Sequence, residues 1–167
     1  MSERFRFQPL ETADTETSIR KKRQLQKKAF LAMVLVYDRK EREGERADYT
    51  DRLDFDPDLS AWVKQMRWHP FLKKIMLRED TYLILAQSTM RTERCRHIAY
   101  KTFCHHCPAT CYSERLLPAV RDIMRYSGPR MFLYFPVTSI RFLRNVQKNY
   151  RRQKKAEKRQ KKSTETE

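Results

Sequence analysis

Every cysteine of this chain lies in one short stretch, residues 95–111, together with three of its four histidines. Within that stretch, Cys104 and Cys107 have the two-residue interval that lets two thiolates converge on one tetrahedral metal ion. A metal bound there would fix how the segments on either side pack against each other. The sequence therefore predicts a Cys-rich metal-binding loop. Its four expected ligands are Cys95, Cys104, Cys107 and Cys111.

We expect the metal to be a structural zinc ion, because four thiolates form a closed site with no open position for water. His97, His105 or His106 could replace one of the cysteines as a ligand. Three other interpretations fit the same residues: buried cysteines without a metal, a redox pair at Cys104 and Cys107, and an iron–sulfur cluster. The N-terminus lacks the apolar run of a secretory signal, so we expect a reducing compartment in which disulfides are rare.

Glycine is scarce in this sequence, since Gly44 and Gly128 are the only two. Tight turns that need a positive φ must be few, and the abundant Lys, Arg, Gln, Glu, Leu and Met residues favour helix. The sequence predicts a mostly α fold, with a small helical core, the metal-binding loop and long basic terminal helices. We expect residues 1–14 to be an extended lead-in, 15–147 the helical core domain, and 148–167 a basic C-terminal helical extension and tail.

The first helix is expected to run from an N-cap at Asp14 or Thr15 to about Arg42. Its segment 29–37 is apolar on every side, which predicts that the segment is buried all round. A short core strand is the alternative for this segment, but the helix-forming residues on both flanks favour a helix.

Shorter elements are expected between this helix and the cysteines. Ser60 should cap a helix over 61–68, which ends at His69 because the residue before a proline avoids the α conformation. A second short helix is expected over 71–78, and segment 82–86 could be either a helix or a strand.

Two further helices are expected after the cysteines. The first should run over 113–128 and end at its C-terminal glycine, followed by an extended apolar segment over 130–136. The last helix should begin at Thr138 or Ser139, pack with its front half, and become almost wholly basic over 148–162.

The formal net charge of +16 and the pI near 10.0 indicate a polyanionic partner. The positive charge is concentrated in two blocks, residues 20–28 and 141–162. Each block is attached to an apolar half-helix that would anchor it to the core. We therefore expect both blocks to lie along the phosphates of a nucleic acid. The expected contact residues are Arg20, Lys21, Lys22, Arg23, Lys27, Lys28, Arg141, Arg144, Lys148, Arg151, Arg152, Lys154, Lys155, Lys158 and Arg159.

A small core, basic extensions and a zinc-stapled loop together predict a non-catalytic RNA-binding component of a large ribonucleoprotein, similar in style to ribosomal proteins. Its partners would be structured, rRNA-like RNA and neighbouring proteins, with no small-molecule substrate. The alternative is a scaffold or assembly subunit of a protein complex that does not contact RNA. An enzyme is not expected, because two glycines cannot form a phosphate-binding loop and no nucleophile–base pair is evident.

The expected location is an intracellular reducing compartment, either the mitochondrial matrix ribosome or the nucleus and cytoplasm. The longest unbroken apolar run, 29–37, is far shorter than the roughly 20 residues that a membrane-spanning helix needs. No transmembrane segment is therefore expected.

Overall fold

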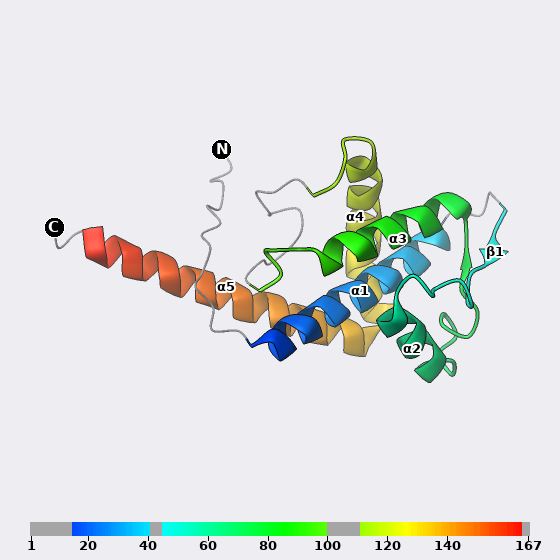
Figure 1. Ribbon diagram of the computed structural model, residues 1–167, viewed down its shortest axis with the longest axis horizontal. Coiled ribbons are helices and arrows are strands. Elements are labelled where there is room, and N and C mark those ends of the chain that lie inside the picture. The colour runs from blue at the N-terminus through cyan, green and yellow to red at the C-terminus, as the bar shows by residue number, and fades with distance from the viewer. Residues whose placement is uncertain (1–14, 41–44, 100–110, 165–167) are drawn as a thin grey trace.

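The computed structural model describes residues 15–40, 45–99 and 111–164, and the described chain is mostly α-helical, as the sequence predicts (Figure 1). Two strands of two residues each pair antiparallel, with Ala47 opposite Leu77 and Asp48 opposite Met76. The elements in chain order are α1 (Glu16–Asp38), β1 (Ala47–Asp48), α2 (Pro57–Gln65), β2 (Met76–Leu77), α3 (Glu79–Glu93), α4 (Leu116–Tyr134) and α5 (Pro136–Thr164).

Helix α1 is the central element of the fold, because α2, α3, α4, α5 and β2 all pack against it. It begins at the N-cap Thr15, whose hydroxyl accepts a hydrogen bond from the Ser18 amide at 3.3 Å. The apolar segment 29–37 is helical, so the alternative of a strand is wrong. Most of this segment is buried, as predicted: Leu31, Ala32 and Val34 are completely buried, whereas Met33 and Tyr37, one turn apart, are only partly buried.

The C-terminal end of α1 is tied to two other parts of the chain through the buried carboxylate of Asp38, which is only 1% exposed. Arg78 Nε lies 2.9 Å from Asp38 Oδ1, and the Thr81 hydroxyl donates to the same oxygen at 2.9 Å. Arg46 Nε lies 3.0 Å from Asp38 Oδ2, and Arg46 also donates to the Asp38 carbonyl. A buried carboxylate needs such partners, so this cluster fixes α1 relative to the strands and to the start of α3.

The segment between α1 and α3 differs from the sequence prediction. Helix α2 begins at Pro57 rather than after Ser60, because Asp56 is the N-cap and its carboxylate accepts the Leu59 amide at 3.0 Å. The predicted helix over 71–78 is wrong: this segment forms turns and strand β2. Segment 82–86, which the sequence left open, lies within helix α3.

Helix α4 is longer than predicted, because it passes through Gly128 and Pro129 and continues to Tyr134. The predicted extended segment over 130–136 is therefore wrong. Burial explains the difference, since Met131 and Phe135 are 2% and 3% exposed at the spacing of one helical turn. The Phe135 amide donates to the Met131 carbonyl at 2.7 Å, which completes the last turn.

Helix α5 begins at Pro136, where the missing amide hydrogen costs no helical hydrogen bond. The start predicted at Thr138 or Ser139 is thus slightly late. The helix packs on the body through Phe142 and Val146, and its side chains are buried as far as Gln153, whereas its last turns project away from the other helices (Figure 1). The predicted boundary at 147–148 falls inside this continuous helix, so the domain division stays a prediction.

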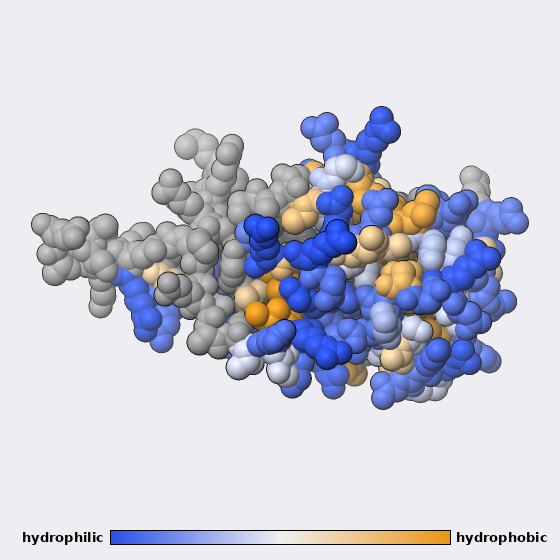
Figure 2. Space-filling model, viewed as in Figure 1, coloured by the Kyte–Doolittle hydropathy of each residue, from blue (hydrophilic) through white to orange (hydrophobic). Residues whose placement is uncertain are grey.

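The surface of the molecule is mainly polar on the face shown in Figure 2, with smaller hydrophobic areas between the hydrophilic side chains. Among the helices that the structure describes, none is long and apolar enough to cross a membrane.

Replacing Asp38 with alanine should lower the free energy of unfolding by about 3–5 kcal/mol, because Arg46 and Arg78 would lose their buried counter-charge. Urea denaturation followed by circular dichroism measures this change. The control is Asp51→Ala, which removes an exposed carboxylate 3.9 Å from Arg67 and should change stability by no more than about 0.5 kcal/mol. Equal effects of the two substitutions would contradict a structural role for Asp38.

Candidate functional site

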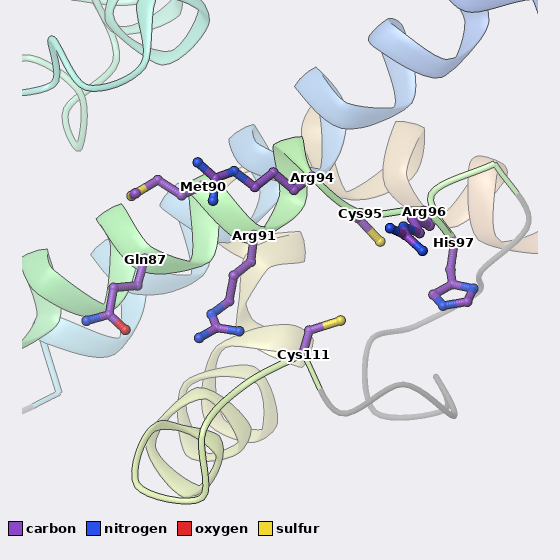
Figure 3. A pocket seen from close by; sticks show the side chains of 8 residues that line it. All are labelled: Gln87, Met90, Arg91, Arg94, Cys95, Arg96, His97 and Cys111. Atoms are coloured by element: carbon purple, nitrogen blue, oxygen red, sulfur yellow. The ribbon is translucent and has the colours of Figure 1, made fainter.

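The candidate site is a cavity of about 570 Å³ at the C-terminal end of α3. Its walls come from the last turns of α3, from the segment that follows this helix, and from the residue where the described chain resumes before α4 (Figure 3). The residues that line it are Gln87, Met90, Arg91, Arg94, Cys95, Arg96, His97 and Cys111.

Two cysteines from separate segments meet at this cavity. Cys95 follows the end of α3, where its amide donates to the Thr92 carbonyl at 3.3 Å, and it is only 8% exposed. Cys111 lies before α4 and is partly exposed. Neither cysteine forms a disulfide, and Figure 3 shows both sulfur atoms beside the same open space. The fold therefore brings two thiols from distant positions to one cavity.

The predicted metal ligands are only partly within the described residues. Cys95, His97 and Cys111 line the cavity, whereas Cys104, His105, His106 and Cys107 lie outside the described residues. Over residues 15–40, 45–99 and 111–164, no three Cys, His, Asp or Glu side chains come close enough to hold a metal ion. The predicted zinc site and its full ligand set thus stay predictions.

Three arginines on this cavity were missed by the sequence reasoning, although Arg91, Arg94 and Arg96 stand close together on either side of Cys95. The guanidinium carbon of Arg91 lies 5.6 Å from the centre of the Tyr112 ring, so Arg91 spans from α3 to the segment before α4. A dense run of arginine beside a cysteine was the available signal in the sequence.

The basic residues of α1 have a different environment from the one predicted. Lys27 is 4% exposed, and its Nζ lies 2.7 Å from Asp56 Oδ2 and 2.6 Å from Glu93 Oε2. Burial alone would lower the pKa of Lys27, but hydrogen bonds and Coulomb attraction from the two carboxylates outweigh it and raise the pKa. Lys27 therefore serves as an internal counter-charge that joins α1, α2 and α3.

Other predicted contact residues of α1 also serve internal contacts. The buried Lys22 donates from Nζ to the Ala99 carbonyl at 2.6 Å, and Arg23 lies 3.8 Å from Glu93. Lys28 Nζ lies 5.7 Å from the centre of the Trp62 ring. Burial lowers the pKa of Lys28, and Arg141 lowers it further against the opposing effect of Asp58.

At the start of α1 the basic side chains reach solvent. Arg20 lies 4.0 Å from Asp58 but is largely exposed, and Lys21 is exposed. The remaining basic residues predicted to contact nucleic acid lie on α5. Arg152 is partly buried there, and the exposed ones are Arg141, Arg144, Lys148, Arg151, Lys154, Lys155, Lys158 and Arg159. Whether this helix contacts a polyanion stays a prediction.

Comparison with known proteins identifies the family. The family model YgbA_NO, described as "Nitrous oxide-stimulated promoter", matches residues 21–157, which run from the second turn of α1 through most of α5. The chain belongs to this family. The match to YgbA_NO also includes the whole stretch 95–111 that carries the cysteines.

A curated relative is similar to part of the chain. The uncharacterized protein YgbA of Escherichia coli (strain K12) is 34% identical over 53 residues, which are 32% of this chain and 45% of that protein. The chain thus spans less than half the length of the curated relative that it matches. No solved structure matches the chain.

The YgbA_NO family overturns two sequence-based predictions. The predicted role as a ribosomal-type component of a ribonucleoprotein is wrong, because the chain belongs to a different family. The predicted mitochondrial or nuclear location is also wrong, since the relative comes from a bacterium, which has neither organelle. Net charge misled the prediction of an RNA-binding role: it counts the buried Lys27 and Lys22 in the same way as the exposed residues of α5.

Lys27→Met should lower the free energy of unfolding by about 3 kcal/mol, because Asp56 and Glu93 would lose their shared cation. Urea denaturation at neutral pH measures the effect. The control is Lys21→Met, which removes the same charge from the exposed face of α1 and should change stability by no more than about 0.5 kcal/mol.

The stabilising effect of Lys27 should also depend on pH. The pKa of Lys27 is higher in the folded state than in the unfolded state, so its stabilising effect is complete below the ordinary lysine pKa. The effect is lost as the pH rises through the folded-state pKa. The difference in stability between wild type and Lys27→Met should therefore shrink in strongly alkaline solution; a difference that grew with pH would contradict the ion cluster.

Proposed function

We propose that this protein is a non-enzymatic, zinc-binding member of a bacterial response to nitrous oxide, the gas that the family description names. The zinc ion would be held by Cys95, Cys104, Cys107 and Cys111. His97, His105 or His106 would be possible replacements for one thiolate. The proposed zinc would be structural and would join the end of α3 to the segment before α4.

The observation that carries this proposal is the approach of Cys95 and Cys111 to one cavity. These residues come from opposite ends of the Cys-rich stretch, and His97 lines the same cavity. A zinc ion bound through ligands from both ends would close this stretch into a loop. Such a site contributes directly to folding, because the ligands are brought together only in the folded chain.

The charge around the cavity supports thiolate ligation. Four thiolates around one Zn²⁺ carry a net negative charge, which has to be offset when the site is partly removed from water. Arg91, Arg94 and Arg96 bring positive charge to the cavity walls. A thiolate site is thus electrostatically compatible with these surroundings.

The proposed ligand set and the family description agree with a non-enzymatic role. A zinc ion with four protein ligands has no open position at which water or a substrate could be activated. The words that describe the family name a promoter and the gas that stimulates it, not a reaction.

The proposal is tested by measuring the metal content of the full chain purified under anaerobic conditions. We expect about one zinc ion per chain, and Cys95→Ser and Cys111→Ser should each lose most of it because a thiolate ligand is removed. The control is His69→Asn, which changes the histidine outside the Cys-rich stretch and should retain the metal. His97→Asn determines whether a histidine belongs to the ligand set.

Two results would overturn the zinc assignment. Protein that contains iron and sulfide, with the visible absorption of an iron–sulfur cluster, would replace zinc with that cofactor. Protein that binds neither metal when purified or when supplied with zinc would remove the metal-binding function altogether.

A further inference from the structure

We propose that the cavity at the end of α3 also binds a small molecule through an oxyanion group, such as a phosphate or a carboxylate, held by Arg91 and Arg96. This inference uses the same cavity as the proposed metal site. It does not require the metal, because it rests on the arginines and on the imbalance of charge among the cavity walls.

The charge on this cavity differs from that on a neighbouring one of about 560 Å³. The neighbouring cavity is lined by four basic side chains and four carboxylates, so its charges can balance: Arg20, Arg23, Lys27 and Arg94 against Glu16, Asp56, Asp58 and Glu93. The candidate cavity shares Arg94 with its neighbour, but it is also lined by Arg91 and Arg96, and none of its described lining residues is Asp or Glu. An anion is therefore the expected occupant of the candidate cavity alone.

The acidic residue closest in sequence does not correct this imbalance. Glu93 lies between Arg91 and Arg94 along the chain, but its carboxylate lies 2.6 Å from Lys27 and 3.8 Å from Arg23. The side chain of Glu93 therefore pairs with these two basic residues of α1 and does not neutralise the cavity arginines. No ion pair is observed between the three cavity arginines and any carboxylate whose side chain the structure describes.

The end of α3 does not account for three positive charges. The dipole of a helix places roughly half a negative charge at its C-terminus, which favours one nearby cation. Arg91 and Arg96 alone carry about four times that charge. In Figure 3, Arg91 extends towards Cys111, and Arg96 lies between Cys95 and His97. These two arginines therefore approach the thiol end of the cavity from different segments.

The size and lining of the cavity indicate the class of ligand. A volume of about 570 Å³ lies within the roughly 300–1,000 Å³ that is typical of small-molecule sites. Guanidinium groups match the geometry of phosphate and carboxylate oxygens, which they bind through paired hydrogen bonds. Met90 and Gln87 line the part of the cavity along α3 and would contact the rest of such a ligand.

The competing explanation is that the arginines only offset the negative charge of a zinc–thiolate site. Under that explanation, replacing an arginine weakens metal binding and the cavity has no specific affinity for an added oxyanion. Under the proposal, the protein binds an oxyanion and the arginines determine its affinity. The two explanations therefore predict different results in a single titration.

The test is calorimetric titration of the full chain with inorganic phosphate, at constant ionic strength and with sodium chloride as the reference titration. We expect saturable binding of one phosphate per chain. Arg96→Gln and Arg91→Gln should each weaken the affinity at least about ten-fold, since each removes a charge-assisted hydrogen-bond donor. Arg91→Lys keeps the charge but loses the paired donors, so it should bind with intermediate affinity.

The matched control is Arg144→Gln, which makes the same change on the exposed surface of α5 and should alter the affinity less than about two-fold. Arg96 is itself exposed, so Arg96→Gln keeps the test interpretable even if Arg91→Gln disturbs the contact with Tyr112. Absence of saturable phosphate binding to wild type would overturn the proposal. An equal loss of affinity in Arg144→Gln would overturn it as well, because phosphate would then be responding to net charge.

Zinc content measured on the same samples shows whether the oxyanion site or the proposed zinc site has failed. If the arginine variants lose zinc but bind phosphate as well as wild type does, the arginines are counter-ions only and the oxyanion site is wrong. If the protein contains no zinc but binds phosphate in an arginine-dependent way, the oxyanion site stands and only the metal-binding function fails.

Discussion

The structure depends on the burial of one apolar helical segment. Segment 29–37 of α1 has no polar face, so other elements have to cover most of its surface, and only Met33 and Tyr37 remain partly exposed. A buried charge lies at each end of this segment, with Lys27 before it and Asp38 after it. Each charge is satisfied by partners from the elements that surround α1. The apolar segment thus brings these elements together, and the two ion clusters fix their positions along the helix.

Much of this arrangement could be predicted from the sequence, but some of the helix ends could not. Segment 29–37 is a strong signal because its burial follows from its own composition. The continuation of α4 through Gly128 and Pro129 is not visible locally, since these residues ordinarily end a helix and only the burial of Met131 and Phe135 favours the longer form. The predicted helix over 71–78 failed for a related reason: pairing of β2 with β1 depends on residues distant in sequence.

The candidate site could also be predicted only in part, since the sequence shows its cysteines but not the role of its arginines. Clustering of every cysteine in one short stretch selected Cys95 and Cys111, and the fold does place both beside one cavity. The three arginines were missed because their importance depends on where Glu93 points, and the sequence does not show that this carboxylate turns towards Lys27. The sequence likewise could not separate the lysines that neutralise internal carboxylates from the basic residues of α5 that remain exposed.

The continuity of α5 gives the molecule a mechanical property. With 29 residues rising about 1.5 Å each, this helix is about 44 Å long, and its base lies at the corner where Phe135 joins it to α4. Burial of Phe142, Val146 and Gln153 fixes α5 on the body along more than half of its length, so the helix cannot turn about this corner. The basic residues of its last turns are therefore held at a fixed distance from the core.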